Sequence, residues 1–155
     1  MCADNVYTSK EVLKMEEKLL NALNFTLSVP TTLDFLNVYK YWMPTLDEKV
    51  GYLAQYLSEL ALQEYQFLKY KPSLVAACCL SLAQYCIVGT CWSEEMENVT
   101  RYKWPELNEC MRELQAVYSN APFSSLSVVK KRYVKPERMQ VSSMSPPANY
   151  NMTFP

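Results

Sequence analysis

Cysteine side chains can bind metals, form redox pairs or act as nucleophiles, so they are the first candidates for chemistry in this chain. There are six, at Cys2, Cys78, Cys79, Cys86, Cys91 and Cys110. No two of them are spaced as C-x-x-C, and the chain contains no histidine. We therefore expect neither a zinc site nor a thiol redox motif. Most of these cysteines lie in apolar helical patterns, which predicts reduced thiols in the core of an intracellular protein.

The sequence also shows no recognisable combination of catalytic residues. Without histidine, a serine or cysteine nucleophile lacks its usual basic partner. Asp47–Glu48 and Glu94–Glu95 are acidic pairs at predicted helix starts, where carboxylates suit the helix dipole. No glycine-rich phosphate loop occurs. The sequence predicts a protein that is not an enzyme, with no metal, no cofactor and no small-molecule ligand.

Composition narrows the class of partner. The 155 residues carry a formal net charge of -1. With no basic excess, nucleic acid is not an expected partner. No apolar run approaches the roughly 18 residues of a membrane span, so no membrane partner is expected. The first five residues have no basic or apolar region typical of a secretory signal.

The apolar spacing predicts an all-α fold. Only two glycines occur, Gly51 and Gly89, and apolar residues recur at intervals of three and four. Thr8 and Glu11 form a capping box that starts the first helix. A second capping box is expected at Thr45–Glu48. The predicted helices cover residues 8–24, about 31–43, 45–65, 72–88, 93–102 and 107–118, with a basic turn or helix at 127–133.

The run from Ser73 to Val88 is apolar on nearly all sides and rich in small residues. Such a helix is typically buried all round. We predict that it is the central helix of a bundle, with Gly89 as its C-cap.

Two changes of pattern divide the chain. Pro30 disfavours helix at Val29, so residues 28–31 are interpreted as a linker between helical units. From Val134 the period is lost and Ser, Pro and Asn increase. The predicted segments are residues 1–29, 30–133 and an extended or disordered tail at 134–155.

Glu16 breaks the pattern of the first helix. It projects between Leu20 and Leu23, inside the apolar stripe. A carboxylate buried there without a partner would cost several kcal/mol. Either Glu16 reaches water or pairs with a lysine of the chain, or it meets a donor on another protein. The sequence leaves both interpretations open.

Several segments, in order and spacing, resemble A- and B-type cyclins, from the junction between the two boxes (residues 7–36) through the entry to the central helix of the second box (residues 70–77). They are Tyr7-Thr8, Glu11-Val12-Leu13-Lys14-Met15-Glu16, Leu19-Leu20-x-x-Leu23-x-Phe25-x-Leu27-x-x-Pro30-Thr31-x-x-x-Phe35-Leu36, Leu53-Ala54-x-Tyr56-Leu57-x-Glu59-Leu60, Tyr70-Lys71-Pro72-Ser73-x-Val75-Ala76-Ala77, and Trp92 with Thr100-x-Tyr102. The late Pro146-Pro147 is closer to the A-type.

The resemblance implies a fold and a function. Residues 1–29 would end the N-terminal cyclin box, and residues 30–133 would form the C-terminal cyclin box. The function implied is that of a nuclear and cytoplasmic regulatory subunit, which binds and activates a cyclin-dependent protein kinase to control cell-cycle progression and mitosis. In the family, a full first box with a substrate-docking patch precedes this segment. Those helices are not in this sequence, so the chain is either a fragment or a natural truncation, and for a truncated product we expect weak kinase binding or none.

The resemblance also implies which residues bind the kinase. The matching positions are Glu16, Leu20, Phe25 and Leu27, which would contact the αC helix of the kinase. For Phe25 and Leu27 a place in the chain's own core is an equal alternative. A second class also stays open, a helical adaptor or transcription-factor module with a cyclin-like fold.

Overall fold

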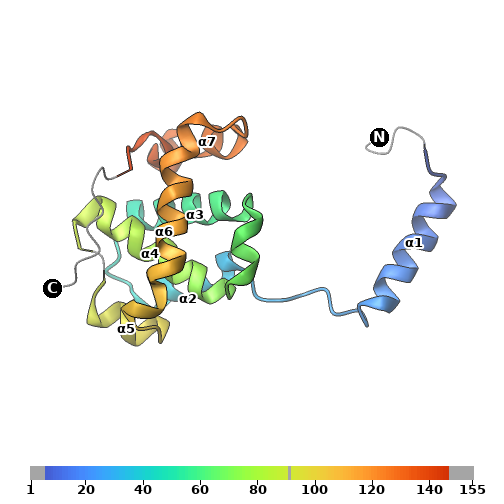
Figure 1. Cartoon of the computed structure of the whole chain (residues 1–155), viewed down its shortest axis with the longest axis horizontal. Coiled ribbons are helices and arrows are strands. Elements are labelled where there is room, and N and C mark those ends of the chain that lie inside the picture. The colour runs from blue at the N-terminus through green and yellow to red at the C-terminus, as the bar shows by residue number, and fades with distance from the viewer. Residues whose placement is uncertain (1–5, 91, 147–155) are drawn as a thin grey trace. The chain divides into compact units, whose positions relative to one another are not determined.

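The computed structural model describes residues 6–90 and 92–146, and within these ranges the chain is helical without a strand. The predicted all-α class is therefore confirmed (Figure 1). The chain divides into two compact units, Met1–Pro30 and Thr31–Pro155. The elements are α1 (Ser9–Ala22), α2 (Thr32–Trp42), α3 (Glu48–Leu62), η1 (Tyr65–Lys69), α4 (Pro72–Val88), α5 (Glu94–Thr100), α6 (Trp104–Asn120), η2 (Ala121–Phe123), α7 (Val128–Tyr133), η3 (Pro136–Arg138) and η4 (Val141–Ser143).

Helix α4 is the centre of the second unit, as the sequence predicted. Every side chain from Val75 to Ala83 is buried, and the helix packs against α2, α3, α5 and α6. It ends at Gly89, whose φ of 85° is left-handed and whose N–H donates to the Tyr85 carbonyl at 3.0 Å. Glycine adopts this conformation without steric cost. In the described part of the chain, no helix combines the length and apolar character needed to cross a membrane.

Helices α3 and α6 pack against α4 through apolar stripes. The buried residues of α6 recur mostly every three or four positions, which places them on one face of that helix. In α3 nine of the fifteen residues are buried, so this helix is covered on more than one side. The buried side chains include Val50, Leu53, Leu57 and Leu60 of α3, and Leu107, Cys110, Met111, Leu114 and Tyr118 of α6.

Side chains that hydrogen-bond to nearby backbone N–H groups determine where α1 and α3 begin. The Thr8 N–H donates to Glu11 at 2.8 Å, and the Glu11 N–H donates back to Thr8 Oγ1 at 3.3 Å. The predicted capping box of α1 is thus confirmed. The box predicted at Thr45–Glu48 is wrong, because Asp47 caps α3 by accepting from the Lys49 N–H at 2.7 Å. The aspartate is one residue before the helix, where a short side chain reaches its free N–H groups.

Four cysteines lie in the described residues as free thiols. Cys78, Cys79 and Cys110 are buried, and Cys86 is partly buried. Burial raises the pKa of Cys78 and Cys79 well above the usual range and that of Cys86 to about 11. These thiols are therefore neutral packing groups, as predicted. Cys2 and Cys91 lie outside the described residues.

The segment after α7 is structured, which corrects part of the predicted tail at 134–155. Residues 134–146 contain η3 and η4, and Val141 is fully buried. Tyr118 Oη donates to the Met144 carbonyl at 3.1 Å, and Ser142 Oγ to the Lys130 carbonyl at 2.8 Å. Short 3₁₀ turns have no 3.6-residue period, so the apolar pattern could not reveal them. Residues 147–155 lie outside the described residues.

Candidate partner-binding site at the end of α1

Helix α1 presents its apolar side to solvent within the first unit. None of its side chains is buried, and Leu20 alone among them is partly buried. We call Val12, Met15, Leu19 and Leu23 the α1 stripe; each is between 51% and 55% exposed. Exposed apolar residues gathered on one helix face are typical of an interaction surface.

The chain leaves α1 through a Schellman motif. Leu23 is the C-cap, and Asn24 follows with a left-handed φ of 49°. The Phe25 N–H donates to the Leu20 carbonyl at 2.9 Å, and the Asn24 N–H to the Asn21 carbonyl at 3.1 Å. These are the two bonds that define the motif, which often pairs the side chains at the Phe25 and Leu20 positions. The motif therefore joins two residues that the resemblance assigned to one interface.

Phe25 has an unusual backbone. Its φ is 56°, a left-handed conformation that a bulky aromatic residue rarely adopts. Its side chain is 65% exposed, and that of Leu27 is 63% exposed. Within residues 6–30 neither residue is buried, and both the interface and the internal packing interpretations stay predictions. Strained backbone of this kind clusters at binding sites.

Hydrogen bonds continue through the turn to Leu27. The Thr26 N–H donates to the Leu23 carbonyl at 2.9 Å, and the Leu27 N–H to the Phe25 carbonyl at 3.0 Å. The backbone from α1 to Leu27 is thus defined by local bonds alone. These backbone bonds define where Phe25 and Leu27 follow the helix end.

Glu16 lies one turn before Leu20, on the same face of α1. It is exposed, and among the described residues it makes no ion pair. Of the alternatives left open for Glu16, pairing with a lysine of the chain is therefore not formed among the described residues. Glu16 reaches water here, and its role at an interface stays a prediction. In residues 6–90 and 92–146 no cluster of His, Cys, Asp or Glu could hold a metal ion.

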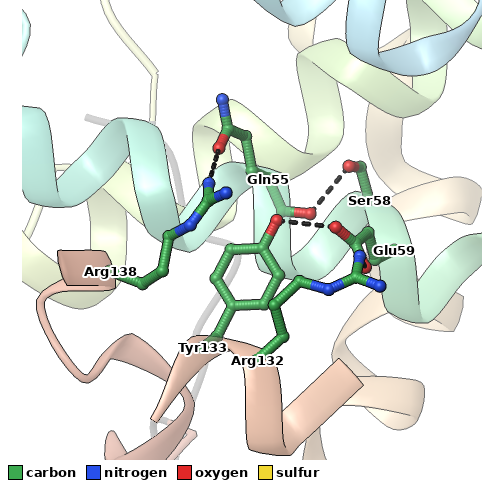
Figure 2. A network of polar contacts seen from close by, with 6 residues as sticks. All are labelled: Gln55, Ser58, Glu59, Arg132, Tyr133 and Arg138. Atoms are coloured by element: carbon green, nitrogen blue, oxygen red, sulfur yellow. Dashed lines mark hydrogen bonds and ion pairs between the residues drawn. The ribbon is translucent and has the colours of Figure 1, made fainter. Parts of the chain in front are cut away.

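A polar network that the sequence did not reveal fixes the segment around α7 to α3 (Figure 2). Glu59 accepts a hydrogen bond from Tyr133 Oη at 2.8 Å and pairs with Arg132 at 2.6 Å. Arg138 donates to Gln55 Oε1 at 3.3 Å, and its guanidinium lies 5.4 Å from the Tyr133 ring centre. Burial and the bond to Glu59 raise the pKa of Tyr133 above its usual range. The basic residues at 127–133 predicted a turn or helix there. They did not indicate its partners, which lie more than 70 residues away in the sequence.

Comparison with known sequences identifies the class of this fold. The family model of the cyclin C-terminal domain matches residues 30–147, which is more than half of the chain. The chain belongs to the cyclin family.

Its relatives include A-type cyclins. The G2/mitotic-specific cyclin-A of Patella vulgata is 35% identical over 152 residues, which cover 97% of this chain and 35% of the relative. Cyclin-A2 of Homo sapiens is 34% identical over 150 residues, covering 96% of this chain and 35% of the relative. Cyclin-A1 of Homo sapiens is 38% identical over 146 residues, which cover 94% of this chain and 31% of the relative. The chain thus spans about a third of the length of the curated relatives it matches.

Proposed function

We propose that this chain acts as a regulatory subunit that binds and activates a cyclin-dependent protein kinase, and so controls cell-cycle progression. Membership of the cyclin family supports this proposal. So does the name of one relative, a G2/mitotic-specific cyclin-A. The kinase would be the partner, and the chain would supply no catalytic group of its own. Action in the nucleus and cytoplasm during mitosis belongs to the same proposal.

The observation that carries the proposal is the turn that ends α1. It joins Leu20 and Phe25 through a 2.9 Å backbone bond, and Phe25 and Leu27 are mostly exposed. A backbone already ordered by hydrogen bonds lowers the cost of ordering a turn on binding, and apolar and aromatic anchors often dominate interface energetics. The Glu16 carboxylate, one turn back, would receive a donor from the kinase.

The mechanism would be positional. By packing against the kinase αC helix, Leu20, Phe25 and Leu27 would stabilise the inward position of that helix. There its glutamate pairs with the lysine that holds the ATP phosphates. The chain would bind the active arrangement more tightly than the inactive one, and this difference in affinity would shift the kinase population.

A kinase capture experiment tests the proposal. The 155-residue chain is immobilised, exposed to an extract of dividing cells, and the retained proteins are identified by mass spectrometry. We expect a cyclin-dependent kinase among them, and we expect the purified kinase to phosphorylate its substrate faster when the chain is added. The double variant Leu20→Ala/Phe25→Ala is the matched control and should retain less kinase. If no protein kinase is retained and the purified kinase is not stimulated, a role as helical adaptor is favoured instead.

A further inference from the structure

Charge is separated along the chain in a way the kinase proposal does not use. Residues 114–155 contain five cations, Lys130, Lys131, Arg132, Lys135 and Arg138, and one acid, Glu137. These residues carry a net charge of +4, and the whole chain has a formal net charge of -1, so residues 1–113 carry a net charge of -5. In the second unit α5, with Glu94, Glu95 and Glu97, lies near the start of α6, and α7 lies near its other end (Figure 1). The α7 end of the unit is therefore its basic end.

The two arginines of this segment are occupied internally. Arg132 pairs with Glu59 at 2.6 Å, and Arg138 bonds to Gln55 while lying against the rings of Tyr52 and Tyr133, as Figure 2 shows in part. Within the segment, the Lys130 carbonyl accepts from Ser142 Oγ, which joins α7 to η4, and η4 itself packs against α3. These contacts fix the backbone that carries the lysines.

Three lysines are left without an acidic partner. We call Lys130, Lys131 and Lys135 the α7 lysine surface. Lys131 and Lys135 are exposed and Lys130 is partly exposed, and among the described residues no ion pair involves any of the three. Val128 and Val134, beside them in sequence, are 67% and 44% exposed. The segment that carries the α7 lysine surface thus has unpaired positive charge and exposed apolar side chains close together in sequence.

We propose that the α7 lysine surface binds a segment of a partner protein that is rich in Asp and Glu and carries an apolar residue. An arginine guanidinium favours planar, bidentate contacts with its partner. Lysine ammonium groups act as point charges and bind carboxylates in many orientations. Carboxylates on a flexible segment satisfy them, while an apolar side chain covers Val128 or Val134. Residues 31–113, the rest of the second unit, hold eleven acids and seven cations, and this excess of negative charge would orient the approaching segment toward the α7 end.

Other anionic partners fit this surface less well. Duplex-binding proteins commonly make about 6–10 phosphate contacts, and three lysines cannot supply that number. Basic clusters that hold anionic membranes contain about 4–8 cations. A short acidic protein segment matches the size and charge of the surface.

Fluorescence anisotropy tests the proposal with the whole chain. The probe is a labelled 12-residue peptide containing six Glu and two Leu, and its control has Gln in place of every Glu. We expect saturable binding of the Glu peptide that weakens as salt rises from about 50 to 200 mM, and at least tenfold weaker binding of the Gln peptide. Lys131→Glu/Lys135→Glu should weaken binding at least tenfold.

The matched control is Lys71→Glu/Arg112→Glu, which makes the same change of charge at two exposed positions away from α7. It should weaken binding by no more than about twofold to threefold if the site is local. Equal losses from the two double variants, or equal binding of the Glu and Gln peptides, would overturn the proposal. So would tighter binding of a 12-nucleotide single strand or of vesicles with 30% phosphatidylserine. Because this surface belongs to the second unit and shares no residue with the end of α1, its failure would leave the kinase proposal intact.

Discussion

The Tyr133–Glu59 hydrogen bond joins residues 74 positions apart. Its contribution to stability can be measured by removing one atom, the hydroxyl oxygen of Tyr133. Tyr133 is 2% exposed, and its hydroxyl donates to Glu59 Oε1 at 2.8 Å. Tyr133→Phe removes the donor but leaves Glu59 its pair with Arg132, so the loss should be about 1 kcal/mol of unfolding free energy. Urea unfolding followed by circular dichroism measures it. Tyr65→Phe, at a tyrosine that is 87% exposed, is the control and should match the parent. A Tyr133→Phe midpoint equal to that control would show that the bond contributes nothing.

Buried tyrosines predict how stability depends on alkaline pH. Tyr39 is 4% exposed, and burial raises its pKa to about 12. In the unfolded chain a tyrosine has a pKa of about 10. Because the folded pKa is higher, this stabilisation is complete below pH 10 and is lost as pH rises from 10 through 12. The melting temperature should be flat from about pH 8 to 9.5 and then fall, and Tyr39→Phe should make the fall shallower. A flat profile up to about pH 11.5 would contradict this assignment.

At the level of single residues, the sequence predicted local pairs better than distant ones. The capping bond between Thr8 and Glu11 spans three residues and follows from residue type and spacing. Glu59 and Arg132 approach each other only because α3 and α7 pack together. Nothing in the local spacing of either residue indicated that contact. The left-handed backbone of Phe25 was equally hidden, since aromatic residues rarely adopt it.

The burial of helix α4 at the centre of the bundle can be tested by a single substitution. Ala77 is fully buried among the helices around α4. Ala77→Asp should place an unpaired carboxylate in this core and cost at least about 3 kcal/mol. Thermal and urea unfolding would measure the loss. Ala116→Asp in α6, at an exposed alanine, is the matched control and should cost less than about 1 kcal/mol. If both variants unfold like the parent, α4 is not the buried centre of the bundle.

Elements with a strong period were predictable, and those held by tertiary contacts were not. Helix α4 was evident because sixteen consecutive residues, from Ser73 to Val88, are nearly all apolar or small. The turns η3 and η4 were missed because contacts distant in sequence hold them. Arg138 of η3 bonds to Gln55, and a buried valine and two side-chain bonds to backbone carbonyls hold η4 and the residue after it. The start of α3 was placed two residues early, because Thr45 matches a capping box but Asp47 makes the bond.

The α1 stripe has a consequence for the whole molecule. Its four side chains, Val12, Met15, Leu19 and Leu23, are each about half exposed, and together they offer a continuous apolar surface. We expect the chain to self-associate at high micromolar concentration and to bind a hydrophobic dye. Leu19→Glu/Leu23→Glu should shift sedimentation toward the monomer and reduce dye fluorescence. A clean monomer of the parent, without dye binding, would contradict the prediction.

The most direct test of the central claim, that the end of α1 binds the kinase, is isothermal titration calorimetry of the chain with a purified cyclin-dependent kinase. Leu20→Ala and Phe25→Ala should each weaken binding by about 1–3 kcal/mol, because they remove apolar anchors. Glu16→Ala should match that loss only if its carboxylate is desolvated in the complex, since an exposed pair contributes about 1 kcal/mol or less.

Lys14→Ala, on the polar side of α1, is the control and should bind like the parent. A melting curve for each variant separates lost binding from lost folding, which matters most for Phe25 with its left-handed backbone. The account predicts folded Leu20→Ala and Phe25→Ala variants with binding weakened by about fivefold or more. Folded variants that bind the kinase as tightly as the parent would contradict it and place the interface elsewhere.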